Sequence, residues 1–285
     1  MAGGKLVAMV FGASRGIGRQ IAINLGGKYH VIVLSKTVTG GTLPGTIQEV
    51  VQEIENAGGT GEAIQCDVRD QAAIESAIDT VYSKYNRLDA VIYNPGAIHW
   101  GTVAESSVKK YELMHQVNSR GLYIVVSKAL PLFTKQNYGR FIVVCPPVYS
   151  RFFRGKTAYA MTKVSMSVMV MGLAMELPPS IAITGIWPAT AIQSYVTDVK
   201  GLDKGHLRSP QIFADAVDLM LQDNPQNING KCLIEEDYLR SKGVTDFKKY
   251  RSDPDVEPRR MLPMEFPSLL VKEQDDRGIQ IKSKI

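Results

Sequence analysis

Tyr159 and Lys163 are residues whose types and spacing could do proton-transfer chemistry. Residues four apart on a helix share one face, so the Lys163 ammonium can lie near the Tyr159 phenol oxygen and favour its ionised form. A tyrosine with an ordinary pKa of about 10 is a poor acid or base at neutral pH, and a neighbouring cation brings that pKa closer to neutrality. The pair is therefore a candidate proton donor and acceptor. The alternative is a half-buried helix face with a lysine that reaches solvent.

A second candidate site follows the apolar run over residues 6–11, which is typical of a strand buried on both faces of a parallel sheet. Gly12 allows a sharp turn, Gly16 a close approach of a ligand, and Gly18 close packing of the next helix on the strand. The free N–H groups and positive dipole end of that helix suit a pyrophosphate. The sequence thus predicts a dinucleotide site, although a tight turn without a ligand would carry the same glycines.

Two cations accompany this glycine turn. Ser35 and Lys36 stand at the end of the second predicted strand, where NAD-binding folds commonly carry an acidic residue for the ribose hydroxyls. No carboxylate occupies that place, whereas Arg15 and Lys36 could hold the 2′-phosphate of NADP. NADP is therefore favoured over NAD, with a solvated Lys36 at a loop edge as the alternative.

The elements that must position these residues alternate along the chain. Strands are predicted at residues 6–11, 30–35, 62–66, 88–93, 141–145, 181–187 and 232–234. Helices are predicted at residues 17–27, 47–57, 71–84, 107–133, 157–177 and 214–221. The alternation predicts an α/β fold with a doubly wound, Rossmann-type parallel sheet, in a single domain over residues 1–245. Residues 246–285 mix prolines and charges without a period, which predicts an extended C-terminal tail that could cover another part of the protein or a partner subunit.

Composition narrows the class of protein. The net charge of +5 is spread along the 285 residues, so nucleic acid is not an expected partner. Cys66, Cys145 and Cys232 are widely separated, form no metal-like spacing, and argue for a reducing compartment. No secretory signal or bilayer-spanning run is recognised, which predicts a cytoplasmic protein without a membrane span. The last residues, Ser283-Lys284-Ile285, differ by one substitution from the peroxisomal signal Ser-Lys-Leu, so the peroxisome is the alternative.

Five motifs together carry a family resemblance. In chain order they are the glycine turn over residues 12–18, Asp67-Val68, Asn94-Pro95-Gly96, Asn118, and Tyr159-x-x-x-Lys163. With this order and spacing, most of the first 240 residues resemble the short-chain dehydrogenase/reductase family. Four further stretches are similar to its hydroxysteroid dehydrogenase-like protein two subgroup: Lys36-Thr37, residues 43–47, Pro146-Pro147, and Trp187-Pro188 followed by Thr190-Ala191-Ile192.

This resemblance implies an NADP-binding oxidoreductase domain and a role for each motif. Tyr159 would give a proton to a carbonyl oxygen as hydride arrives from the nicotinamide, Lys163 would also hold the nicotinamide ribose, and Asn118 would hold a proton-relay water. The implied cofactor site consists of Gly12, Ser14, Arg15, Gly16, Ile17, Gly18, Lys36, Asp67, Val68, Asn94, Pro95, Gly96, Tyr159, Lys163, Pro188 and Ile192. The family's subunits commonly pair through two long helices, so a homodimer or homotetramer is expected.

One departure from the family pattern falls beside the expected catalytic tyrosine. The family usually has a serine thirteen positions before it, whose hydroxyl helps to hold the substrate oxygen, and this chain has Pro146 there. Proline has no group that can donate a hydrogen bond. Cys145 and Ser150 are the nearest substitutes in the sequence. The loss of one such donor costs on the order of a hundredfold in rate.

The expected function is an NADPH-dependent reductase, or in reverse a dehydrogenase, that acts on a carbonyl or alcohol of a small, largely apolar molecule. A non-redox enzyme that reuses the NADP site is one alternative, and a non-catalytic dinucleotide-binding or scaffold protein is another. Residues 149–154 combine aromatic side chains with two arginines and could hold an anionic or acyl substrate. An exposed loop explains that composition nearly as well.

Overall fold

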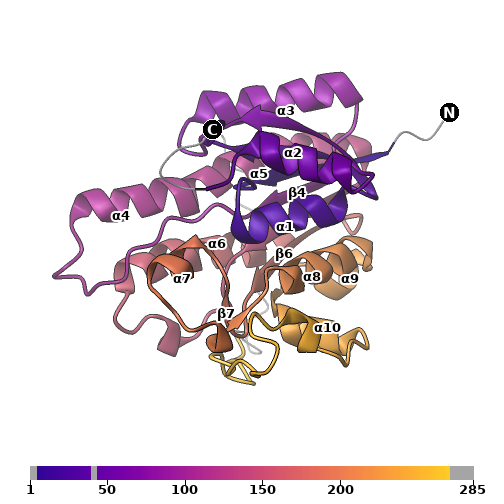
Figure 1. Cartoon of the computed structure of the whole chain (residues 1–285). Helices are drawn as coiled ribbons and strands as arrows, with labels where there is room; N and C mark the ends of the chain where they lie inside the picture. Colours follow the sequence, from indigo (N-terminus) through magenta and orange to yellow (C-terminus); the bar gives the residue numbers. More distant parts are fainter. Residues whose placement is uncertain (1–4, 40–43, 270–285) are drawn as a thin grey trace.

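Seven parallel strands form the centre of the fold, and helices cover both faces of the sheet (Figure 1). The computed structural model describes residues 5–39 and 44–269. The strand order is β3-β2-β1-β4-β5-β6-β9, with every neighbouring pair parallel. The strands are β1 (Leu6–Phe11), β2 (Tyr29–Ser35), β3 (Thr60–Gln65), β4 (Ala90–Tyr93), β5 (Gly139–Val144), β6 (Ile181–Trp187) and β9 (Cys232–Ile234). The predicted doubly wound, Rossmann-type sheet is therefore confirmed.

The main helices follow the strands, all but the last as the alternation predicted. They are α1 (Gly16–Leu25), α2 (Ile47–Asn56), α3 (Gln71–Tyr85), α4 (Val108–Met114), α5 (Gly121–Gln136), α6 (Thr157–Ala174), α8 (Gln211–Gln222) and α10 (Glu235–Ser241). In β1, Ala8 and Val10 belong to the core under α1 and α8, whereas Met9 and Phe11 belong to the core under α3, α5 and α6. Both faces of the strand are buried, which is why its sequence is apolar without alternation. Within the described ranges, no helix has both the length and the apolar character needed to cross a bilayer.

The prediction of one uninterrupted helix over residues 107–133 is wrong for the middle of that range. A π-helical turn, His115–Arg120, separates α4 from α5 and contains Asn118. The N–H of Gly121 bonds the carbonyl of Gln116, five residues back, and the Tyr93 hydroxyl donates to the carbonyl of Val117 at 2.5 Å. The phenol of β4 thus satisfies a carbonyl that the wider turn leaves free. Periodicity in the sequence cannot show this because the partner lies on another element.

The segment after β6 contains short elements that the sequence pattern did not predict. They are β7 (Ala191–Ile192), α7 (Tyr195–Val199), β8 (Leu207–Arg208) and α10. Strand β7 pairs with β8, and Arg208 forms an isolated antiparallel bridge with Arg251. These elements have two to seven residues, too few to show a periodic pattern by themselves.

Residues 246–269 of the C-terminal region pack on the domain. Phe247 and Tyr250 are buried in the core with α8 and α10, and Leu262 is buried beside Ala189. Arg208 is 1% exposed and forms ion pairs with Glu236 at 3.0 Å and with Glu257 at 2.6 Å. Residues 270–285, with the tripeptide Ser283-Lys284-Ile285, lie outside the described residues, as does Leu43.

Gly185 of β6 lies between two cysteines of the neighbouring strands. Their sulfur atoms, Cys145 Sγ and Cys232 Sγ, are 4.0 Å apart, and a Cβ at Gly185 would lie 2.7 Å and 2.9 Å from them. Gly185→Ala is expected to lower the free energy of unfolding by about 1–3 kcal/mol, because the sheet cannot widen without cost. Urea denaturation followed by circular dichroism measures the change.

The control is Gly172→Ala in α6, where an added Cβ meets no atom within 4 Å. Alanine in a helix gains up to about 1 kcal/mol over glycine, so this variant should match or exceed the wild type. If both variants were as stable as the wild type, the tight packing over Gly185 would be refuted.

Candidate active site

The glycine turn joins β1 to α1 at the carboxyl edge of the sheet. Gly12 and Gly16 have φ values of +72° and +55°, in a region of backbone conformation that residues other than glycine rarely adopt. A Cβ at Gly18 would lie 2.4 Å from the Gly12 carbonyl oxygen, which also accepts a hydrogen bond from Asn94 Nδ2 at 2.9 Å. At Gly16 nothing lies within 4 Å of the Cβ position. The turn is thus tight against α1 and open where a phosphate would approach the helix N-terminus.

Two cations lie at the end of β2 beside this turn. Arg15 Nη2 donates to Thr37 Oγ1 at 3.1 Å. The guanidinium therefore extends from the glycine turn to Thr37, the residue after Lys36. Ser14 Oγ lies 3.2 Å from Ser35 Oγ and fixes the same two segments together. Lys36 is exposed. The structure therefore places the Arg15 guanidinium at the end of β2, beside the glycine turn.

Asp67 and Val68 follow β3 at the same edge of the sheet. Arg69 binds the Asp67 carboxylate through Nε and Nη2, and these hydrogen bonds lower the pKa of that carboxyl. Val68 is buried. The negative charge of Asp67 is therefore balanced locally and does not oppose an anionic cofactor.

Asn118 links the turn after β4 to α6. Its Oδ1 accepts from the Ala97 N–H at 2.8 Å, while its Nδ2 donates to the Ala97 carbonyl at 3.0 Å and to Thr162 Oγ1 at 2.9 Å. A Cβ at Gly96 would lie 3.7 Å from Lys163 Nζ and 3.9 Å from Asn118 Oδ1. The fold thus brings the Asn94-Pro95-Gly96 motif, Asn118 and Lys163 together.

Tyr159 and Lys163 lie on a buried face of α6, and both side chains are at most 6% exposed. Lys163 Nζ donates to the carbonyl of Val144 at 2.8 Å and lies 5.5 Å from the centre of the Trp187 ring. Burial lowers the pKa of Lys163 to about 8 and raises the pKa of Tyr159 well above its usual value. The expected lowering of the Tyr159 pKa by Lys163 is therefore wrong for this arrangement, because burial penalises the phenolate and the ammonium is held at Val144.

The loop after β5 brings aromatic rings to Tyr159. Cys145 Sγ faces Cys232 over Gly185, and burial raises the pKa of its thiol. Ser150 is exposed at the start of a 3₁₀ turn. The Phe152 ring, 3% exposed, lies 6.1 Å from the Tyr159 ring. Within the described part of the chain, neither Cys145 nor Ser150 thus forms a hydrogen bond with Tyr159.

The loop after β6 is held at Ala189 from both sides. The Ala189 N–H donates to both carboxylate oxygens of Glu235, at 3.0 Å and 2.7 Å. The Ala189 carbonyl accepts from the N–H groups of Met261 and Leu262, at 2.8 Å and 3.2 Å. Thr190 Oγ1 is buried and has no hydrogen-bond partner among the described residues. Pro188 and Ile192 flank these residues, so the predicted cofactor loop is fixed in place and contains one buried hydroxyl without a hydrogen-bond partner in the described chain.

Glu235 is a site residue that the motifs did not reveal. It is fully buried at the start of α10, directly after β9, which neighbours β6 in the sheet. Burial raises the pKa of its carboxyl to about 8, against the effect of the N–H groups that donate to it. An acidic residue directly after a predicted strand was the available signal, but its partner Ala189 is 46 residues away.

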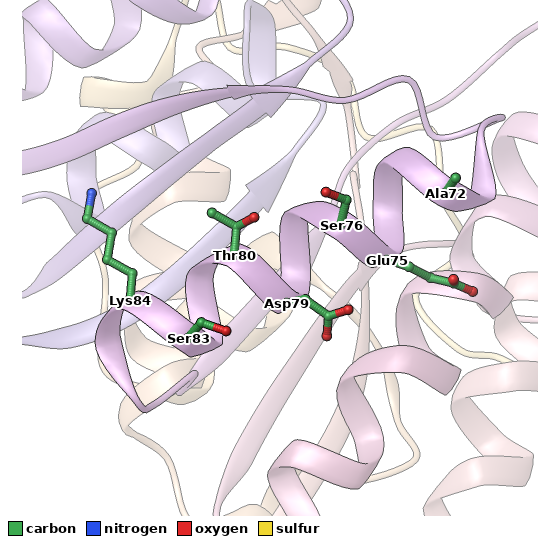
Figure 2. A pocket seen from close by; sticks show the side chains of 7 residues that line it. All are labelled: Ala72, Glu75, Ser76, Asp79, Thr80, Ser83 and Lys84. Atoms are coloured by element: carbon green, nitrogen blue, oxygen red, sulfur yellow. The ribbon is translucent and has the colours of Figure 1, made fainter.

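The surface also has an open hollow of about 740 Å³ on α3 (Figure 2). Its lining residues all belong to that one helix: Ala72, Glu75, Ser76, Asp79, Thr80, Ser83 and Lys84. None of them is a predicted site residue. The hollow lacks aromatic side chains, which makes it a poor match for a nicotinamide or an apolar substrate.

The chain belongs to the short chain dehydrogenase family, whose pattern matches residues 6–200. It is similar to hydroxysteroid dehydrogenase-like protein 2 of Danio rerio, with 34% identity over 282 residues that cover 94% of this chain and 66% of that protein. This chain therefore spans just under two thirds of the length of that relative. Both the family and the subgroup predicted from the motifs are confirmed.

Solved structures show the same architecture. A short chain dehydrogenase from Mycobacterium thermoresistibile has a TM-score of 0.82 and 31% identity, over 90% of this chain and 93% of that chain. A metagenomic short-chain oxidoreductase in complex with NADP has a TM-score of 0.66 and 24% identity, over 80% of this chain and 96% of that chain. The second likeness is one of fold alone.

The raised pKa of Glu235 predicts how stability depends on pH. Between about pH 5 and about pH 8 the folded protein keeps a proton that the unfolded chain has lost, so the free energy of unfolding should fall as pH rises. Glu235→Gln replaces the carboxyl by a neutral group of the same shape that does not titrate. The free energy of unfolding of this variant should therefore fall less between these pH values than that of the wild type. Urea denaturation at several pH values measures both curves.

Glu112→Gln, at an exposed position of α4, is the matched control and should follow the wild type. Curves for Glu235→Gln and wild type that stay parallel over this range would show that Glu235 is already ionised in the folded protein.

Proposed function

We propose that the protein is an NADPH-dependent reductase, or in reverse a dehydrogenase, of a small and largely apolar carbonyl compound or alcohol. The observation that carries this proposal is that Lys163 of α6 lies beside Asn118 and the turn at Gly96, with Tyr159 one turn earlier on the same buried face of α6. The glycine turn opens at the same edge of the sheet. A proton donor and a dinucleotide site thus share one edge, which is what hydride transfer to a carbonyl requires.

Tyr159 is the proposed proton donor to the substrate oxygen. The phenol is protonated at physiological pH and so has a proton to give to a developing alkoxide, although burial raises its pKa and makes it a weaker acid. Lys163, on the same buried face of α6, is the proposed holder of the nicotinamide ribose. The nicotinamide, when bound, supplies the hydride. Asn118 ties the turn at Ala97 to Thr162 of α6 and so fixes the distance between substrate loop and catalytic helix.

The preference for NADP rests on charge at the end of β2. Arg15 reaches Thr37, and Lys36 is its exposed neighbour in sequence. A 2′-phosphate carries negative charge that a ribose hydroxyl lacks, so these two side chains distinguish the two cofactors. The unpartnered Thr190 hydroxyl suits the other end of the cofactor, at the nicotinamide.

Tyr159→Phe should lower turnover by at least about a hundredfold while NADPH binding stays within about threefold of wild type, because only the ionisable hydroxyl is removed. NADPH absorbance with a panel of aldehydes, ketones and acyl thioesters measures turnover, and the fluorescence of bound NADPH measures affinity. Full activity in this variant would refute the mechanism. Tight NADPH binding by the wild type without consumption across the panel would favour a dinucleotide-binding or non-redox protein.

Replacement of Arg15 and Lys36 by alanine should weaken NADPH binding by about tenfold or more and NADH binding by less than about threefold, since charge-assisted bonds to phosphate are lost. Lys109→Ala, at an exposed position of α4, should alter neither affinity. Fluorescence titration with each reduced cofactor gives the ratio. An equal loss for both cofactors would contradict the assignment of the 2′-phosphate site.

A further inference from the structure

Five rings form a continuous group around the proposed proton donor, here called the aromatic cluster: Tyr149, Phe152, Tyr159, Trp187 and Phe266. Phe152 is its centre, with ring centres 6.1 Å from Tyr159, 5.8 Å from Trp187 and 5.9 Å from Tyr149. Tyr149 in turn meets Phe266 edge to face at 5.4 Å. Tyr149, Trp187 and Phe266 are only half-buried, so the cluster offers apolar surface to a ligand.

Phe266 comes from the C-terminal segment, which is fixed against the domain. Arg260 binds the Asp237 carboxylate through both terminal nitrogens, at 2.6 Å and 2.7 Å. Arg151 Nη2 donates to the Met261 carbonyl at 2.9 Å, and the Met261 N–H donates to Ala189. The segment is therefore held to both α10 and the cofactor loop, which makes Phe266 a defined wall of the aromatic cluster.

Lys156 places a positive charge at this cluster. Its Nζ lies 4.5 Å from the centre of the Phe152 ring, one turn of α6 before Tyr159. The side chain is half-buried, and no carboxylate of the described residues forms an ion pair with it. Burial lowers the pKa of its ammonium. Such a group is stabilised when a bound anion replaces the water it has lost.

The two arginines of the same loop do not compete for this role. The guanidinium of Arg151 is bonded to the Met261 carbonyl, and Arg154 is exposed. Lys156 is therefore the cation of this loop that contacts the aromatic cluster and has no acceptor in the described chain.

We propose that the substrate is an apolar carbonyl compound or alcohol that carries a carboxylate, with its apolar part against the aromatic cluster and its carboxylate bound by Lys156. This inference rests on the proposed function, because it takes Tyr159 as the proton donor. The centre of the Phe152 ring lies 6.1 Å from that of Tyr159 and 4.5 Å from Lys156 Nζ, so the proton donor and the cation are close enough for one small molecule to reach both. The missing serine beside Tyr159 is consistent with a substrate that is oriented by its charged end.

The test compares a medium-chain oxo acid with its methyl ester on the NADP-loaded protein. Calorimetric titration measures binding, whether or not turnover occurs. Wild type should bind the acid at least about tenfold more tightly than the ester. Lys156→Met keeps the apolar stem over Phe152, and it should remove this preference while affinity for the ester changes by less than about threefold. Lys156→Arg should retain the preference.

Two further variants separate charge from packing. Lys135 on α5 is a matched control, since its ammonium lies 5.8 Å from the centre of the Tyr82 ring of α3, and Lys135→Met should leave both affinities unchanged. Phe266→Ala should weaken acid and ester alike. Equal binding of acid and ester by wild type, or an unchanged preference in Lys156→Met, would overturn the proposal. A separate measurement tests the proposed function. A neutral aryl ketone has no carboxylate for Lys156 to bind, so NADPH consumption with this ketone reports on Tyr159 alone.

Discussion

The parallel sheet imposes the constraint on which the site depends, because all of its strands end at one edge. The residues that follow these carboxyl ends are Gly12, Lys36, Asp67, Asn94, Pro146, Pro188 and Glu235. Seven segments that are far apart in the sequence therefore lie along one edge of the sheet. The position is also the one where α/β sheets bind ligands, since helix N-termini and free backbone groups converge there. Helix α6 adds Tyr159 and Lys163 from the side, and the hydrogen bond from Lys163 to Val144 fixes this helix to the end of β5.

Burial decides the electrostatics of the proposed catalytic pair, Tyr159 and Lys163. Four-residue spacing places Tyr159 and Lys163 on the same face, and in water the cation alone would favour the phenolate. In the folded protein both groups are nearly inaccessible to water, and burial favours the neutral form of each. It therefore raises the pKa of the phenol and lowers the pKa of the ammonium. A neutral phenol with a proton to give and a cation close by is consistent with reduction of a carbonyl. The same reasoning applies to Lys156. Its ammonium is partly buried, which lowers its pKa, and no carboxylate of the described residues forms an ion pair with it.

The C-terminal segment contacts both the loop after β6 and the aromatic cluster. Ala189 accepts hydrogen bonds from Met261 and Leu262 and donates to Glu235, so the loop expected at the nicotinamide is held by two later parts of the chain. Five residues after Met261, Phe266 closes the aromatic cluster. Anything that displaced this segment would therefore alter both the cofactor loop and the substrate wall. Mechanical coupling of this kind explains why residues with no motif of their own belong to the site.

The sequence alone determined the Rossmann-type sheet, the family and its subgroup. Apolar runs, glycine spacing and the Tyr159-x-x-x-Lys163 pattern are local signals, and they persist whatever lies around them. Only the tertiary structure revealed the π-helical turn at Asn118, the role of Glu235 and the wall formed by Phe266. Each depends on a partner more than twenty residues away: Val117 on Tyr93, Ala189 on Glu235, and Tyr149 on Phe266. It also reversed the expected pKa shift of Tyr159, because desolvation depends on the atoms that surround a group and not on its neighbours in sequence.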